Sequence, residues 1–83
     1  MIVVKAVEVA SEYLKRYFPV VKNIRMEEFE LTEDKEFWFI TLSYTEQTSR
    51  DKSLQENTKF KIFKIENETF LVFSMKTKEF KSV

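Results

Sequence analysis

Apolar residues recur at helical spacing over residues 3–18, with polar residues between them. Val7, Ala10 and Leu14 form the centre of the apolar stripe, and charged side chains occupy the opposite side. Pro19 follows directly, and proline ends a helix because it lacks a backbone N–H and disfavours helical geometry in the residue before it. The pattern predicts one amphipathic helix at 3–18.

After this proline the apolar period changes to two, which is typical of β-strands. Four segments show the alternation, at about 23–31, 36–45, 59–66 and 69–77. Four strands in hairpin order form an antiparallel meander, and a helix can pack across one of its faces. We therefore expect a single α+β domain over residues 1–83, with one N-terminal helix on one face of a four-stranded antiparallel sheet.

Two of the predicted strands change phase, and one connection is long. The first strand changes phase at Glu27-Glu28, where a β-bulge would keep the apolar residues on both sides of it facing the core. The third strand changes phase between Ile62 and Phe63, which leaves the direction of the Phe63 side chain open. Residues 46–58 are almost entirely polar and predict a long, mobile hairpin loop.

One helix can cover only one face of this sheet, so the composition of the other face matters. Phe37, Phe39, Phe70 and Val72 alternate away from the helix, and Phe63 joins them if a bulge re-aims it. A solvated sheet face is mostly polar, so an apolar one predicts a protein partner or a homodimer. The alternatives are that the 46–58 loop or the C-terminal tail covers this face, or that the faces are assigned wrongly.

The composition argues against chemistry. The chain has no His and no Cys, which removes the commonest general base, thiolate ligands and disulfides. It also has no Gly, so loops that cradle a phosphate group are excluded. Glu27 and Glu28 would share an acid–base site only if a bulge re-aims one of them. We expect no enzyme activity, no cofactor and no metal site.

The charges point to few classes of partner. The 14 basic and 14 acidic residues balance, so there is no overall basic field for nucleic acid. Lysines are frequent over residues 59–81 beside Phe60 and Phe63, so single-stranded nucleic-acid binding through strands three and four is the alternative function. A solvated strand face explains the same lysines, and arginine is absent from that stretch.

Lys5 and Glu8 interrupt any signal-like apolar run, and no segment reaches membrane-spanning length. We expect a cytoplasmic location.

Four stretches together resemble the PepSY-like domains: Ala6–Leu14, Phe18-Pro19, Ile24–Glu28 and Phe60–Val72. Members of that family begin with an alanine-containing helix, a Phe-Pro stop and an acidic first strand, and they end in a similar hairpin. The resemblance implies a helix-on-sheet, cystatin-like architecture and a binding or inhibitory role, and it brings no catalytic residues. The sequence thus predicts a small non-catalytic interaction module, with an inhibitory or immunity-type role as one form.

Overall fold

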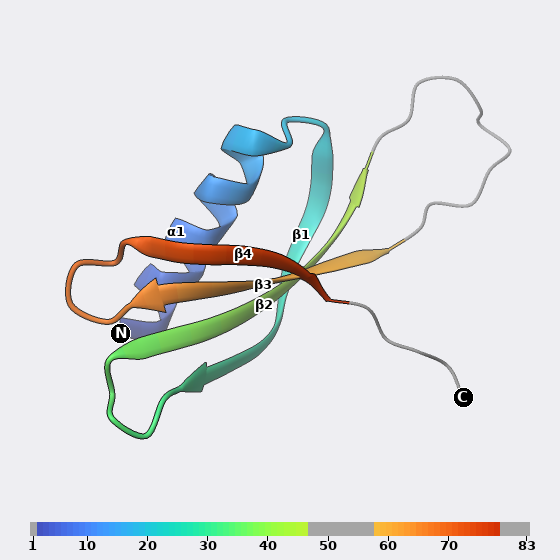
Figure 1. The fold of residues 1–83 in the computed structure, drawn as a ribbon. Helices are drawn as coiled ribbons and strands as arrows, with labels where there is room; N and C mark the ends of the chain where they lie inside the picture. The colour runs from blue at the N-terminus through green and yellow to red at the C-terminus, as the bar shows by residue number, and fades with distance from the viewer. Residues whose placement is uncertain (1, 47–57, 79–83) are drawn as a thin grey trace, which may run out of the picture.

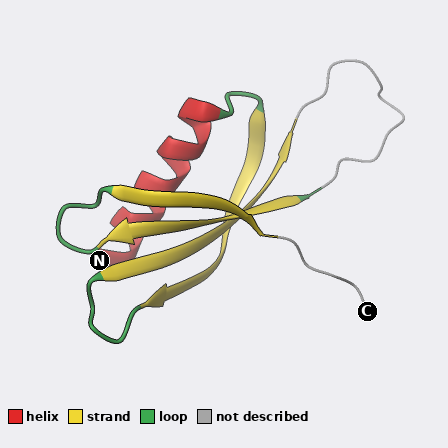
Figure 2. Ribbon diagram, viewed as in Figure 1, coloured by secondary structure: helices red, strands yellow, loops and turns green. Residues whose placement is uncertain are grey.

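The computed structural model of the 83-residue chain describes residues 2–46 and 58–78. One helix packs on a four-stranded antiparallel sheet whose strands follow chain order across the sheet (Figure 1). The elements are α1 (Ile2–Tyr17), β1 (Val21–Leu31), β2 (Phe37–Glu46), β3 (Lys59–Glu66) and β4 (Val72–Lys78). The expected α+β fold is confirmed, and Figure 2 shows α1 lying across one face of the sheet.

The core lies between α1 and the sheet. Ala6, Ala10 and Leu14 follow one another at intervals of one turn and form the fully buried stripe of the helix. The two alanines leave little bulk between the helix backbone and the strands, which lets α1 approach the sheet closely. The sheet side of the core consists of Trp38, Ile40, Leu42 and Tyr44 from β2, and Phe63 and Ile65 from β3.

The chain turns sharply where α1 ends. The Phe18 N–H donates to the Leu14 carbonyl over 2.8 Å, which completes the last helical hydrogen bond. Pro19 has no N–H to continue the pattern, and the Val21 N–H instead donates to the Phe18 carbonyl over 3.1 Å. This short turn brings β1 back alongside the helix.

Asn67 ties together the two hairpin turns at one end of the sheet. Its backbone N–H donates to the Glu36 carbonyl over 2.9 Å, and its side-chain amide donates to the Lys35 carbonyl over 3.0 Å. Its side-chain oxygen accepts the indole N–H of Trp38 over 2.7 Å. A single residue of the β3–β4 turn therefore fixes the β1–β2 turn and one core aromatic.

The chain has no glycine, and three of the residues that the structure describes adopt positive φ: Asn23 at 57°, Lys35 at 62° and Phe70 at 60°. Asparagine tolerates this left-handed region because its short polar side chain bonds locally, whereas lysine and phenylalanine do so at a cost of the order of 1 kcal/mol. Lys35 and Phe70 lie in the β1–β2 and β3–β4 turns. Both turns therefore carry backbone strain.

The β-bulge predicted at Glu27-Glu28 is confirmed. Met26 pairs with Leu42 and Glu28 pairs with Thr41, so Glu27 is an extra residue in β1. The phase change predicted in the third strand is wrong. β3 pairs with β2 without interruption, so its side chains alternate strictly.

Phe63 consequently lies in the core and not on the outer face. It pairs with Ile40, is 0% exposed, and presents its ring to Tyr13 of α1 at 6.2 Å in an edge-on arrangement. The prediction of Phe63 as an interaction residue is therefore wrong. An unbroken ladder leaves its side chain on the helix side.

Phe70 and Val72 were also expected on the outer face, and both instead pack against the core. Ile65 pairs with Val72 and Lys64 with Ser74, so Phe73 is an extra residue in β4. One inserted residue reverses the side to which the preceding side chains point. The bulge at Phe73 therefore exchanges the two faces at the start of β4.

The loop predicted at 46–58 lies almost wholly outside the described residues, which omit positions 47–57. The C-terminal tail, positions 79–83, lies outside them too, and so does the expectation that either segment covers the outer face. The only helix in the described part of the chain, α1, is too short and too polar to cross a lipid bilayer.

Candidate interaction surface

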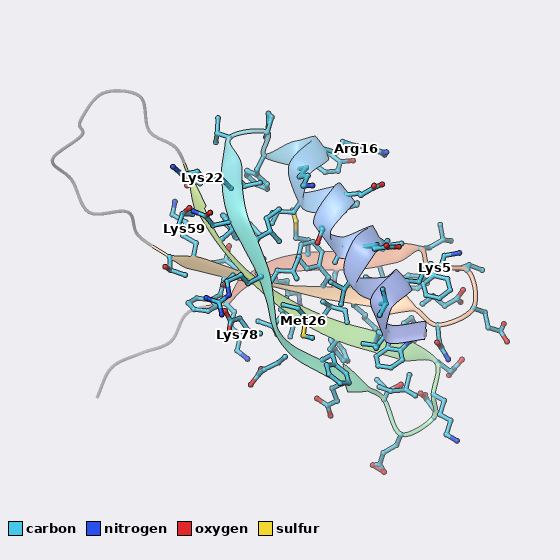
Figure 3. All side chains as sticks on the ribbon, turned by 180° about the vertical axis from the view of Figure 1, so that it is seen from behind. Lys5, Arg16, Lys22, Met26, Lys59 and Lys78 are labelled. Atoms are coloured by element: carbon cyan, nitrogen blue, oxygen red, sulfur yellow. The ribbon has the colours of Figure 1, made fainter. Side chains whose placement is uncertain are left out.

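The outer face of the sheet is the side that points away from α1. It faces the viewer in Figure 1, and Figure 3 shows the molecule from behind, with α1 in front of the strands. Strict alternation in β2 and β3 places every second residue of these strands on this face. From β2 these residues are Phe37, Phe39, Thr41, Ser43 and Thr45, and from β3 they are Phe60, Ile62, Lys64 and Glu66.

Four apolar side chains gather on this face near the hairpin turns, and we call them the outer patch: Phe37, Phe39, Ile62 and Phe73. The rings of Phe37 and Phe73 meet edge to face, with their centroids 5.0 Å apart. Phe73 of edge strand β4 is 54% exposed. A hollow of ≈ 380 Å³ lies over the patch between Phe39, Ile62 and Phe73. The patch is an apolar surface in contact with solvent.

Charged residues border the outer patch with opposite signs on its two sides. Glu30 of β1 pairs with Phe39, and Phe39 pairs on its other side with Lys64 of β3. In the next row Glu28 flanks Thr41, and Lys76 of β4 flanks Ile62. In these two rows the acidic side chains therefore come from β1 and the basic ones from β3 and β4, while Glu66 of β3 pairs with Phe37.

The side chain of Lys64 folds over the outer patch. The Nζ atom of Lys64 is 4.3 Å from the centroid of the Phe37 ring, a cation–π contact. Such a contact at a partly exposed site is worth about 0.5–1 kcal/mol. It holds the charge above the outer patch and directs it toward anything that docks there.

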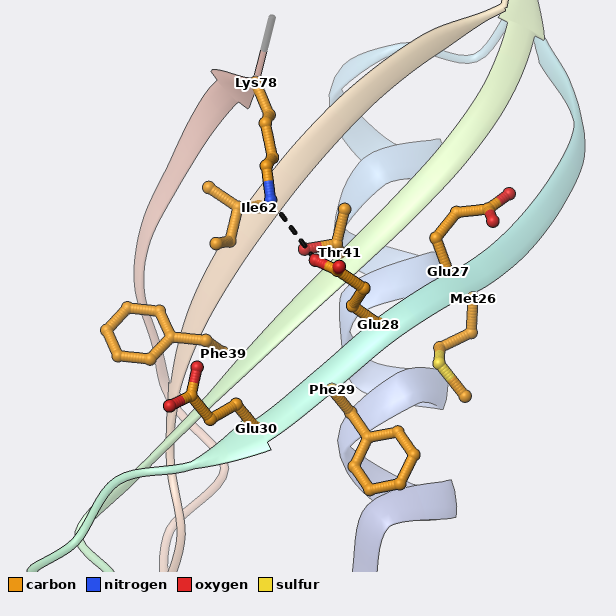
Figure 4. Close-up of a pocket in the computed structure, with 9 residues that line it drawn as sticks. All are labelled: Met26, Glu27, Glu28, Phe29, Glu30, Phe39, Thr41, Ile62 and Lys78. Atoms are coloured by element: carbon orange, nitrogen blue, oxygen red, sulfur yellow. Dashed lines mark hydrogen bonds and ion pairs between the residues drawn. The ribbon is translucent and has the colours of Figure 1, made fainter. Parts of the chain in front are cut away.

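Sheet twist closes the other half of the outer face. The Nζ atom of Lys78, on edge strand β4, lies 3.2 Å from a carboxylate oxygen of Glu28, on edge strand β1 (Figure 4). In a flat sheet these strands would be about 14 Å apart, since three spacings of about 4.8 Å separate them. The right-handed twist of the strands brings the two edges together diagonally above Thr41, and Ile62 lies at the boundary with the outer patch.

This half is polar and only partly closed. Thr41 and Ser43 point to the outer side of β2, yet they are only 2% and 3% exposed. The Ser43 hydroxyl donates to a Glu27 carboxylate oxygen over 2.6 Å. A hollow of ≈ 520 Å³ remains between Glu28, Glu30, Phe39 and Lys78. The buried polar groups on this half are therefore already satisfied within the chain.

The bulge does bring the two carboxylates of Glu27 and Glu28 to the same half of this face, as an acid–base pair would need. Each is engaged elsewhere, however, Glu27 with Ser43 and Glu28 with Lys78. Within 2–46 and 58–78, no group of three or more acidic side chains gathers where it could hold a metal ion. The arrangement offers apolar area and bordering charge, which is the chemistry of binding.

The chain was compared with protein-family models, with curated proteins and with solved structures. None of the three comparisons gave a match. The resemblance to PepSY-like domains accordingly stays a prediction, and the function is argued from this surface alone.

Two of the five predicted interaction residues, Phe37 and Phe39, lie together in the outer patch. The other three lie on the helix side. The outer patch contains Ile62 and Phe73 as well, and sequence reasoning missed both. Strict alternation through 59–66 would have found Ile62, whereas the bulge that exposes Phe73 leaves no signal in the sequence.

Proposed function

We propose that this chain is a non-catalytic protein-interaction module that binds through the outer face of its sheet. The observation that carries the proposal is the outer patch, four apolar side chains in contact with solvent on a face that α1 does not cover. An apolar patch bordered by charge is typical of a protein-binding surface. An inhibitory or immunity-type role is one form of this function.

The size of the patch sets the affinity that we expect. If docking buries about 300 Å² of apolar surface, the hydrophobic contribution is about 7.5 kcal/mol at about 25 cal/mol per Å². Association itself costs about 4–15 kcal/mol in lost rigid-body freedom. A weak or moderate complex follows unless the charged border adds to it.

Site-specific photo-crosslinking in cells tests the proposal. A photoreactive phenylalanine analogue replaces Phe39 in the full chain, and the matched control carries it at Tyr17, which is 57% exposed on α1. We expect a discrete crosslinked protein from position 39 and none from position 17. The mass of the adduct shows whether the partner is a second copy or a different protein.

The proposal fails if position 39 gives no adduct, or if both positions give the same ones. A fold control is needed, because Phe39 is partly buried. The two substituted chains should have circular dichroism spectra and thermal midpoints close to those of the unsubstituted chain.

Single-stranded nucleic-acid binding is the second candidate, and one observation favours it: Lys64 and Lys76 border the same hollow as Phe39 and Phe73. Aromatic rings beside cations suit stacked bases. Two features weigh against it. Lys61 lies over the Phe18 ring on the helix side, and Glu30 adds a negative charge beside Phe39. The lysine stripe is thus divided between two faces.

Fluorescence anisotropy with a short single-stranded oligonucleotide at low salt tests this candidate. Binding should weaken steeply as salt rises, because displaced counterions dominate such affinities. Replacement of Lys64 and Lys76 with glutamine should abolish it. An unchanged anisotropy at low salt ends this candidate.

A further inference from the structure

One row of residues across the strands of the outer face carries an acid and a base on either side of an aromatic ring. Glu30, Phe39 and Lys64 are direct cross-strand neighbours on β1, β2 and β3. Adjacent strands lie about 4.8 Å apart, so the acid and the base flank the aromatic ring at similar distances on opposite sides. The order across the sheet is acid, aromatic, base.

These two flanking charges are available to a partner. Among the described residues, Glu28 and Lys78 neutralise each other within the chain, whereas Glu30 has no ion-pair partner there. The Lys64 ammonium lies over the face of the Phe37 ring, and no carboxylate of these residues forms an ion pair with it. In the neighbouring row Glu28 is therefore paired within the chain, whereas neither charge of the Glu30–Phe39–Lys64 row has an ion-pair partner among residues 2–46 and 58–78.

We infer that the partner of the outer face is a second copy of this chain, docked face to face about a two-fold axis that runs parallel to β2 and passes over Phe39. The inference rests on the proposed function. This axis exchanges the two sides of the row. Phe39 then meets the other copy's Phe39, and each Glu30 lies opposite the other copy's Lys64, which gives two symmetric ion pairs around an aromatic pair.

The charge order selects this axis over its main alternative. A two-fold axis across the strands keeps each side of the row where it is, so Glu30 would face Glu30 and Lys64 would face Lys64. Like charges opposed across an interface are unfavourable. Both axes keep the strands of the two sheets aligned, as packed twisted sheets prefer, so the charge order decides between them.

The half-closed outer face limits the strength of the pairing. Stable interfaces bury about 800 Å² per partner, and the open half of a four-stranded face of this length offers less. We therefore expect self-association with a dissociation constant between about 10 μM and 1 mM.

Charge exchange between the two flanking residues tests the arrangement. Glu30→Lys alone and Lys64→Glu alone each place like charges opposite each other in both pairs. We expect either variant to weaken self-association by about 10- to 30-fold in sedimentation equilibrium. The double variant E30K/K64E should return to within about 3-fold of the unchanged chain, since both pairs are again opposite in sign.

Mixing the two single variants gives the sharpest readout. In a mixed dimer, the lysine introduced by E30K in one copy faces the glutamate introduced by K64E in the other. The unchanged Lys64 of the first copy faces the unchanged Glu30 of the second, so both pairs are attractive. An equimolar mixture should associate about as strongly as the unchanged chain, although each variant alone associates about 10- to 30-fold more weakly. Glu12→Lys and Lys15→Glu on the exposed side of α1 are the matched controls, because they change net charge equally.

The two-fold arrangement is overturned if the chain associates but the single variants match the α1 controls, or if mixing restores nothing. The second-copy partner is overturned if the chain stays monomeric up to about 1 mM. In either case an adduct of a different protein at position 39 leaves the proposed function standing. Absence of any adduct at that position removes both.

Discussion

The two faces of the sheet are made from the same four strands, yet only the face beneath α1 is buried. On the helix side, Ile40 and Phe63 are 0% exposed beneath α1. On the outer side, their neighbours Phe39 and Ile62 remain partly exposed. Alternation supplies apolar residues to both faces, so burial is decided by what covers each face and not by local composition.

The outer face itself divides into two halves, which limits the binding surface further. Around Thr41 and Ser43, the twist of the strands and the Glu28–Lys78 pair close the face without a helix. Around Phe37 and Phe73, nothing comparable is seen in residues 2–46 and 58–78. A polar half stabilised by the chain itself thus adjoins an aromatic half that is open.

The largest expected effect comes from truncating equivalent phenylalanines on the two faces. Phe63→Ala should lower the free energy of unfolding by about 3–5 kcal/mol, because it leaves a cavity beneath α1. Phe39→Ala should lower it by about 1 kcal/mol, because the side chain already contacts solvent. Urea denaturation of dilute protein measures both.

A domain of this size is stable by only about 4–12 kcal/mol, so a milder variant is needed beside Phe63→Ala. Phe63→Leu keeps most of the volume and should cost about 1–1.5 kcal/mol. Phe39→Leu is its matched partner on the outer face and should cost less. Equal losses at positions 63 and 39 would contradict the distinction between a sealed face and an open one.

The next largest loss of stability is expected in the β3–β4 turn, where Asn67 binds the β1–β2 turn and Trp38. Asn67→Ala removes the acceptor of the Trp38 indole N–H and the side-chain bond to the Lys35 carbonyl. We expect a loss of about 1–3 kcal/mol, since a part-buried donor is left unsatisfied. Asn67→Asp is the control, because its carboxylate still accepts the indole N–H and the loss should be smaller. An Ala variant as stable as the Asp variant would contradict this role of Asn67.

A gain in stability is expected at Lys35, whose φ of 62° costs free energy in a lysine. Lys35→Gly should raise the free energy of unfolding by about 0.5–1 kcal/mol, because glycine reaches this region without strain. Glu33→Gly lies in the same turn at a residue without positive φ, and there glycine should only destabilise. Thermal unfolding distinguishes the two, and a loss at both positions would show that Lys35 is unstrained.

The smallest effect is a pH-dependent one in the same turn. Asp34 raises the pKa of Glu36, first through their side-chain hydrogen bond and then through its charge. A carboxyl group whose pKa is raised on folding destabilises the folded chain at neutral pH, and this cost disappears as the pH falls below its unfolded value. Glu36→Gln should therefore raise the thermal midpoint slightly at about pH 7 and leave it unchanged near about pH 3.

An Asp34→Asn background serves as the control, since the two largest causes of the raised pKa of Glu36 are then gone and only burial and the charges of Glu66 and Glu68 remain. Glu36→Gln in that background should give a smaller gain at about pH 7 and none near about pH 3. A gain that persists at low pH would assign the effect to something other than the charge of Glu36.

The sequence predicted the helix, the strands and the helix-side face of the sheet well, because the spacing of apolar residues depends directly on secondary structure. The stripe of Ala10 and Leu14, the alternation from Trp38 to Leu42 and the bulge at Glu27 each leave a local pattern. Phe39 was placed on the outer face for the same reason.

The features of the outer face that the sequence did not predict depend on contacts between residues that are distant in the chain. Whether Phe73 or Val72 points outward is decided by a single extra residue in β4, and either phase leaves an apolar alternation in the sequence. The contact between Glu28 and Lys78 joins residues 50 positions apart and requires the twist of the whole sheet. Neither can be derived from spacing along the chain.

The most direct test of the central claim, that the chain associates through the open half of its outer face, is a dilution series followed by NMR. Amide and ring signals of the full chain are recorded from about 1 mM down to about 20 μM. Signals of Phe39, Ile62 and Lys64 should shift with concentration while those of Ala10 and Leu14 in α1 stay fixed. Shifts confined to α1, or no shift in any residue, would contradict the claim.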